Sequence, residues 1–258
     1  MKKRNRIRRA RETINSRAER RKALSKQERR NKSGHYIPPM RSFIGKLVVH
    51  LGLLLSYLFL KVKYHNRKRI PRKLPYIIAA NHVSFVDGMW IFNALPASHF
   101  RRTCAMVGAD LNEEYGLLGK IIFKAARAIP VKRDGNAIRS LIIAKNTLLA
   151  GHSILIHPEG TRSHTGGLGP MQSGAAYIAM RSDVPILPVY IAGAEKIWPR
   201  GQKWPRSRDP KTREKLPLDL YFFEPLNPSD YESPEDMHAA LEKVLHRAER
   251  KYHKKESF

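Results

Sequence analysis

Five short apolar runs alternate with helix-like segments along the C-terminal two thirds of the chain. The runs have the length and composition of buried strands, and they cover residues 76–80, 103–107, 153–157, 186–192 and 218–223. Segments with helical periodicity lie between or after them, at 88–95, 116–128, 137–150, 174–181 and 233–255. Such alternation is typical of a parallel sheet covered by helices. We therefore expect an α/β fold with a mostly parallel central sheet flanked by helices.

A longer apolar stretch precedes this pattern. Between Lys46 and Lys61 lie fourteen uncharged residues. As a helix they would span roughly 21 Å at 1.5 Å per residue, which is short of the ~30 Å hydrocarbon core of a bilayer. We expect a membrane-associating helical segment over residues 41–70 that lies on the bilayer or dips into it, with basic residues on both sides. A buried core helix is the alternative.

The N-terminus is strongly basic. Residues 1–34 carry 15 Lys or Arg and 3 Glu, with few large apolar side chains, so they cannot bury a core. We expect a disordered basic arm over 1–40, the anchoring segment over 41–70 and a catalytic domain over 71–258. The basic arm and the apolar run are each weak membrane anchors, but two weak anchors together hold a protein to a membrane. Because they are neighbours in the sequence, we expect a membrane-associated protein. We expect its active site to face the cytoplasm.

The overall charge also restricts the class of partner. The chain has 49 Lys plus Arg against 22 Asp plus Glu, a net charge of +27, which indicates a polyanion: a membrane surface, nucleic acid or a phosphorylated substrate. An RNA-binding protein that uses the arm is the second hypothesis, but the arm lacks aromatic residues for base stacking. Cys104 is the single cysteine, which excludes an intramolecular disulfide and a cysteine-based zinc site, and we expect no metal.

The first candidate site directly follows the run at 76–80. It reads Asn81-His82-Val83-Ser84-Phe85-Val86-Asp87-Gly88. A histidine at the end of a strand, with an aspartate in the first turn of the next helix, predicts a general base and the carboxylate that orients it. The alternative is a helix cap, because Ser84 and Asp87 have the spacing of a capping box. We assign Asn81 and Ser84 supporting roles, with Ser84 as the cap.

Three further motifs follow in order. Pro158-Glu159-Gly160-Thr161-Arg162-Ser163 ends a predicted strand. In it Arg162 offers a planar fork for phosphate, and Glu159 could fix Arg162 or bind a substrate hydroxyl. The run at 129–135 places Arg133 beside the carboxyl edge of the sheet, where open α/β sheets bind ligands. The run at 184–190 has prolines that suit the wall of an acyl-sized groove.

The order and spacing of these four motifs resemble the glycerolipid acyltransferase family, whose best-known members are the 1-acylglycerol-3-phosphate acyltransferases. The resemblance covers residues 76–223. It implies transfer of a fatty acyl group from a CoA or acyl-carrier-protein thioester to a lysophospholipid hydroxyl, without a bound cofactor. It makes His82 the base and Asp87 its partner. The residues that it assigns to acceptor binding are Arg133, Glu159, Gly160, Thr161 and Arg162, with the Gly160 N–H as a candidate oxyanion donor.

The chain departs from the family pattern at three places, one of which is Met171-Gln172-Ser173-Gly174, where members often carry Phe-Lys-x-Gly. His157 stands where family members often have Phe, and Gly108-Ala109-Asp110-Leu111 lacks a lysine that many members carry there. The missing lysine leaves open an acceptor with a larger headgroup than lysophosphatidic acid. The expected partners are thus a lysolipid acceptor, an acyl thioester donor and an anionic membrane surface, and not nucleic acid. The oligomeric state is left open.

Overall fold

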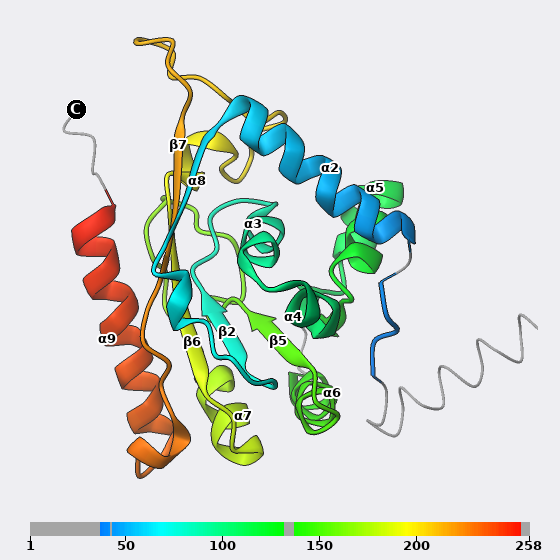
Figure 1. The fold of residues 1–258 in the computed structure, drawn as a ribbon, viewed down its shortest axis with the longest axis vertical. Coiled ribbons are helices and arrows are strands. Elements are labelled where there is room, and N and C mark those ends of the chain that lie inside the picture. The colour runs from blue at the N-terminus through cyan, green and yellow to red at the C-terminus, as the bar shows by residue number, and fades with distance from the viewer. Residues whose placement is uncertain (1–36, 42, 132–136, 254–258) are drawn as a thin grey trace, which may run out of the picture. The chain divides into compact units, whose positions relative to one another are not determined.

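The computed structural model describes residues 37–41, 43–131 and 137–253. Within these residues seven strands form one sheet in the order β1-β7-β6-β2-β5-β3-β4 (Figure 1). Neighbouring strands are parallel except β6 and β7, which are antiparallel. The strands are β1 Lys61–His65, β2 Ile77–Ala80, β3 Thr103–Gly108, β4 Ile129–Val131, β5 Ser153–Ile156, β6 Ile186–Ala192 and β7 Pro217–Phe222. The predicted α/β fold with a mostly parallel sheet is confirmed.

Helices cover both faces of the sheet. α6, α7 and α9 pack together on one face, and α2, α3 and α5 lie on the other (Figure 1). The helices are α2 Phe43–Phe59, α3 Asp87–Ala94, α4 Ala97–Arg102, α5 Leu111–Ala125, α6 Ala137–Leu149, α7 Gly174–Ser182, α8 Ala194–Ile197 and α9 Pro234–Tyr252. The start of α9 is as its sequence predicts, because Ser233 accepts a hydrogen bond from the Asp236 N–H and Pro234 occupies the first turn.

The central strands explain the apolar runs. Every residue of β2, β5 and β6 is buried, as expected for strands covered on both faces. β2 pairs in parallel with both β5 and β6, so the chain leaves the carboxyl ends of these three strands at one edge of the sheet. Ligands bind at this edge in open α/β sheets. The residues that follow β2 and β5 contain the first two candidate motifs.

The segment after α2 differs from the prediction. The helix expected within 41–70 forms but ends at Phe59, and Lys61–His65 is the strand β1, parallel to β7. Val62 and Tyr64 are half-buried while Lys61 and Lys63 are exposed, which is the two-residue period of a strand. Lysine suits an edge strand because it discourages pairing with another chain. From the sequence alone, the same lysines are expected to form the basic border of the membrane anchor.

Residues before α2 are held to the domain by two arginines. The guanidinium of Arg127 donates to the carbonyls of Pro38 (2.8 Å) and Pro39 (2.9 Å). Arg41 is buried between the rings of Phe92 and Phe100. The rest of the predicted basic arm, residues 1–36, lies outside the described residues. Across the described part of the chain, we find no helix with both the length and the apolar character needed to cross a membrane.

Candidate active site

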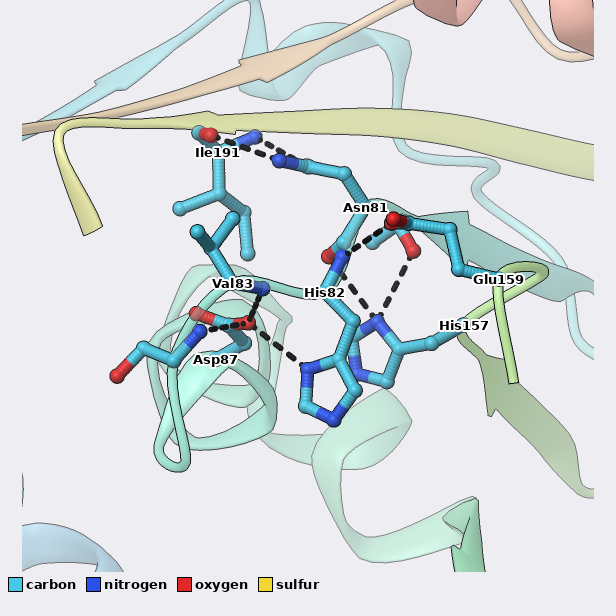
Figure 2. Close-up of polar contacts among 9 residues, drawn as sticks. Asn81, His82, Val83, Asp87, His157, Glu159 and Ile191 are labelled. Atoms are coloured by element: carbon cyan, nitrogen blue, oxygen red, sulfur yellow. Dashed lines mark hydrogen bonds and ion pairs between the residues drawn. The ribbon is translucent and has the colours of Figure 1, made fainter. Parts of the chain in front are cut away.

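His82 and Asp87 meet at the carboxyl end of β2 (Figure 2). The Nδ1 atom of His82 lies 3.0 Å from Oδ2 of Asp87, the first residue of α3. Oδ2 also accepts hydrogen bonds from the backbone N–H groups of Val83 (2.7 Å) and Ser84 (2.8 Å). Because an ionised carboxylate only accepts, Nδ1 carries the hydrogen and Nε2 keeps a lone pair. The predicted pair is therefore together in space, with His82 in the tautomer of a base.

The environment of Asp87 controls its ionisation. Its side chain is fully buried, and burial raises the pKa of Asp87 to about 6. The hydrogen bonds from the Ser84 and Val83 N–H groups act in the opposite direction and limit this rise in pKa. Asp87 is therefore a carboxylate at neutral pH, and it is placed to stabilise positive charge on the His82 imidazole.

Ser84 does not cap the helix, and that prediction is wrong. α3 begins at Asp87, and its N-cap position, Val86, makes no side-chain cap bond. The Ser84 hydroxyl is buried, and it has no hydrogen-bond partner among the described residues. The tight turn between β2 and α3 instead directs the backbone N–H of Ser84 at Asp87. The Asp87 carboxylate therefore accepts a hydrogen bond from the turn that precedes α3. Ser84 supports the site through its backbone alone.

Asn81 ties the end of β2 to β6. Its Nδ2 donates to the carbonyl of Ile191 (2.9 Å), and its Oδ1 accepts from the N–H of the same residue (2.7 Å). Asn81 is 3% exposed, so both bonds are shielded from water. This contact across the sheet fixes the backbone immediately before His82, in agreement with a supporting role.

Glu159 has a different place from the one that we predicted. Its Oε1 accepts from the backbone N–H of His82 (2.8 Å), and its Oε2 accepts from the N–H of Gly169 (2.9 Å). Burial raises the pKa of Glu159, and these two N–H donors lower it in part. Within the described ranges Glu159 forms no ion pair with Arg162. Its carboxylate thus positions the backbone of His82 and does not hold Arg162, and its assignment as a ligand of a substrate hydroxyl stays a prediction.

The Gly160 N–H is engaged within its own turn. It donates to the carbonyl of His157 (3.0 Å), so in this conformation it does not point at a reacting carbonyl. The proposed oxyanion role of this N–H is therefore not supported. Glycine is required for another reason, because Gly160 has φ of +70°, in the left-handed region that favours glycine.

His157 is a site residue whose place sequence reasoning missed. Its ring stacks on that of His82, with centroids 4.0 Å apart and planes 11° apart. Its Nδ1–H donates to the carbonyls of Ala80 (2.9 Å) and Asn81 (3.1 Å) (Figure 2). Burial, together with the charge of His82, lowers the pKa of His157 to about 3, so the stacked ring is neutral. The available signal was its position: β5 pairs with β2, so a ring that directly follows β5 falls beside the residues that follow β2.

His82 and His157 line a cavity of about 780 Å³. One part of its lining is apolar and comes from α2, α3 and α5, for example from Val49, Leu55, Phe59, Met89, Phe92 and Ile122. Another part is polar and includes Thr161 and Arg162. The guanidinium of Arg162 lies 5.4 Å from the centroid of the Phe85 ring. Three of the predicted substrate-binding residues, Gly160, Thr161 and Arg162, thus line the same cavity as His82.

The loop after β5 is fastened to the catalytic turn. The N–H of Ser163 donates to the carbonyl of His82 (2.7 Å), and the N–H of Gln172 donates to the carbonyl of Pro158 (2.9 Å). These bonds bring the second motif over the first. The third motif cannot be placed in the same way, because Arg133 lies outside the described residues and its assignment stays a prediction.

Known proteins share both the sequence pattern and the fold. The 1-acyl-sn-glycerol-3-phosphate acyltransferase alpha of Homo sapiens is 26% identical over 208 residues, which cover 77% of this chain and 67% of that protein. The 1-acyl-sn-glycerol-3-phosphate acyltransferase of Limnanthes douglasii is 27% identical over 201 residues, which cover 75% of this chain and 65% of that protein. The chain thus spans about two thirds of the length of these curated relatives.

A solved structure agrees with these sequence matches. The crystal structure of the 1-acyl-sn-glycerophosphate (LPA) acyltransferase PlsC from Thermotoga maritima superimposes with a TM-score of 0.63 at 25% identity, covering 80% of this chain and 78% of that one. The family described as Acyltransferase matches residues 61–192, about half of the chain. The matched residues run from β1 to the end of β6 and contain His82, Asp87 and His157. These findings do not favour the RNA-binding hypothesis, and the chain belongs to the Acyltransferase family.

Proposed function

We propose that this protein transfers a fatty acyl group from an acyl thioester, either acyl-CoA or acyl-carrier protein, to the hydroxyl of a 1-acylglycerol-3-phosphate or a related lysophospholipid. The observation that carries the proposal is the position of His82, paired with Asp87, on a cavity that is apolar along α2 and α3 and contains arginine elsewhere. A lysophospholipid has the same division, with an acyl chain at one end and a phosphate at the other. The names of the relatives from Homo sapiens and Limnanthes douglasii support the same acceptor class.

The reaction needs only proton transfer and an acyl exchange. Nε2 of His82 removes the proton of the acceptor hydroxyl as its oxygen attacks the thioester carbonyl. The tetrahedral intermediate collapses, the carbon–sulfur bond breaks, and the thiolate takes the proton back from His82. Asp87 stabilises the imidazolium that exists between these two proton transfers. The neutral ring of His157 keeps the imidazole plane fixed by stacking, and Glu159 fixes its backbone.

Direct assay of the purified full-length chain tests this proposal. With palmitoyl-CoA and 1-acylglycerol-3-phosphate in mixed micelles, we expect free CoA and diacylglycerol phosphate to form in equal amounts. The matched control is an acceptor analogue that lacks the free hydroxyl, which should release no CoA above the background rate. Replacing palmitoyl-CoA by palmitoyl-acyl-carrier protein identifies the donor. CoA release that does not depend on the acceptor hydroxyl would indicate a thioesterase and contradict the proposal.

We further propose that α2 attaches the protein to the surface of a membrane, on the cytoplasmic side where acyl thioesters are made. One face of the helix is buried through Val49 and Leu53. The opposite face leaves Leu47, Leu51 and Leu54 between 52% and 56% exposed, with the helical spacing of a continuous apolar stripe. An apolar stripe of this kind marks an interaction surface, and a helix that lies in the interface plane exposes its apolar face to lipid.

Sedimentation with phosphatidylcholine vesicles tests the attachment. Uncharged vesicles at high salt remove the contribution of the basic arm, so binding reports apolar insertion. Replacing Leu47, Leu51 and Leu54 together by Ser should weaken binding at least tenfold, a loss of about 1.4 kcal/mol, because three exposed leucines lose their contact with lipid. The matched control replaces three exposed residues of α6 by Ser in the same way: Ile138, Ile142 and Leu149. Because α6 lies on the other face of the sheet, this variant should bind like the wild type. Equal binding of both variants would contradict the role of α2.

A further inference from the structure

Three arginines line the cavity within the part of the chain that the structure describes: Arg162, Arg200 and Arg206. Arg162 belongs to the motif after β5. Arg200 and Arg206 come from the loop that follows α8 and lie beyond residue 192, where the family match ends. They are thus part of the cavity without being part of the motifs that define the family.

The loop that carries Arg200 and Arg206 is closed by its own hydrogen bonds. The N–H of Arg206 donates to the carbonyl of Ile197 at the end of α8 (2.7 Å). The indole Nε1–H of Trp198 donates to the carbonyl of Gln202 (2.9 Å). The Trp198 ring also lies against Phe85 of the catalytic turn, with centroids 5.8 Å apart. The loop therefore presents its arginines at a defined place beside the active site.

Arg200 is joined directly to the loop after β5. Its Nη1 donates to Oγ1 of Thr161 (3.0 Å) and lies 3.1 Å from Nε2 of His164. A guanidinium has five N–H donors, so most of them are left for a ligand. Neither Arg200 nor Arg206 forms an ion pair with a carboxylate of the described residues.

The balance of charge around the cavity favours an anion. Among the described lining residues, Asp110 is the single acidic side chain against three arginines. Guanidinium groups bind phosphate by paired N–H donors, and a site with several of them is selective for a doubly charged phosphate monoester over a singly charged diester. The ligand of this part of the cavity is therefore expected to carry phosphate.

We propose that Arg200 and Arg206, together with Arg162, bind the phosphate monoester of the acceptor, which makes the loop after α8 a determinant of headgroup specificity. The inference rests on the proposed function, because it takes the acceptor to be a lysophospholipid. In such an acceptor the reacting hydroxyl is on the carbon next to the one that bears the phosphate. A base and an anion site in one cavity fit the short separation between the hydroxyl and the phosphate of this acceptor. The phosphates of acyl-CoA are separated from its thioester by the long pantetheine arm, and so fit it less well.

Kinetics with three acceptors tests the inference. The variants are Arg200→Ala, Arg206→Ala and Arg200→Lys, and the matched control is Lys203→Ala, which removes an exposed charge of the same loop that does not line the cavity. The acceptors are 1-acylglycerol-3-phosphate, a lysophosphatidylcholine and an uncharged monoacylglycerol. Each alanine variant should raise KM for 1-acylglycerol-3-phosphate about tenfold with little change in kcat, because a charge-assisted hydrogen bond is lost.

Selectivity separates this role from a structural one. KM for acyl-CoA and the rate with the uncharged acceptor should be unchanged, Arg200→Lys should recover part of the loss, and Lys203→Ala should behave like the wild type. An equal loss with all three acceptors, or no loss, overturns the inference. A rise in KM for acyl-CoA alone assigns the arginines to the donor and also overturns it.

A binding measurement keeps the inference distinct from the proposed function. Calorimetric titration with 1-hexanoylglycerol-3-phosphate, below its micellar concentration, should show binding to the wild type and about tenfold weaker binding to Arg200→Ala and Arg206→Ala. If the wild type binds this ligand but transfers no acyl group, the proposed reaction is wrong and the anion site stands. If the wild type transfers acyl groups and the variants bind the ligand normally, the anion site is wrong and the reaction stands.

Discussion

Replacing His82 by alanine should lower kcat by about 10²- to 10⁴-fold, the usual contribution of a general base. The substitution removes the imidazole of His82, a residue that lines the cavity, and leaves Asp87 with its two backbone donors, Val83 and Ser84. The measurement is the initial rate of CoA release with saturating acceptor. Because Asp87 keeps those donors, the melting temperature should change much less than the rate.

His246→Ala is the matched control for this variant. It removes an imidazole from α9, which packs on the opposite side of the sheet from α2 and α3, and its only hydrogen-bond partner in the described residues is Glu249 at 3.4 Å. It should retain wild-type kcat. A His82→Ala enzyme that is folded and within tenfold of wild type would rule out the base mechanism.

Replacing Asp87 by asparagine should lower kcat about 10- to 10³-fold. The Val83 and Ser84 N–H groups both point at Oδ2, so the amide oxygen of the new side chain should take that place and still accept from Nδ1 of His82. The tautomer is kept, and what is lost is the negative charge. An opposite charge at this range is worth about one to three pKa units, each a factor of ten. The rate of acyl transfer at pH 7.5 measures the loss.

The pH profile shows whether the charge is responsible. Asp87 is ionised above its pKa of about 6, so kcat/KM of the wild type should fall as the pH drops through this value and the carboxylate is neutralised. His82 must be neutral to act as the base, so both enzymes should lose rate in acid. In Asp87→Asn no carboxylate stabilises the imidazolium, so the acid limb should lie at lower pH than in the wild type. Asp87→Glu, which restores the charge at a displaced position, should recover part of the rate but not the full value. An acid limb of Asp87→Asn at the same pH as that of the wild type would show that the Asp87 charge does not act on His82.

Much of the sheet could be predicted from hydrophobicity because its central strands are buried on both faces. The apolar runs at 76–80, 153–157 and 186–192 correspond to β2, β5 and β6 within one residue at each end. β1 and β4 were missed for physical reasons. β1 lies at an edge with alternating lysines, and β4 has three residues, which is too short to show a period.

The site was predictable as far as its chemistry lies in adjacent residues. His82 and Asp87 are five positions apart, and the turn between them brings them together. The roles of Glu159 and Gly160 depended on the direction of backbone N–H groups at His82 and at the turn after β5, and the order of residues does not determine such directions. The contact of Arg200 with Thr161 joins positions 39 apart, so it depends on the whole fold.

The double role of α2 has a consequence for how the reaction is supplied with acceptor. The same helix lines the cavity through Val49 and Leu55 and exposes Leu47 and Leu51 on its outer face, so one helix about 10 Å across separates the two. With that face in a bilayer, a lysolipid reaches His82 by lateral diffusion and never dissolves in water. The rate then follows the surface density of acceptor in the membrane, not its bulk concentration. Inert phospholipid acts as a diluent, and the bilayer becomes the solvent of the reaction.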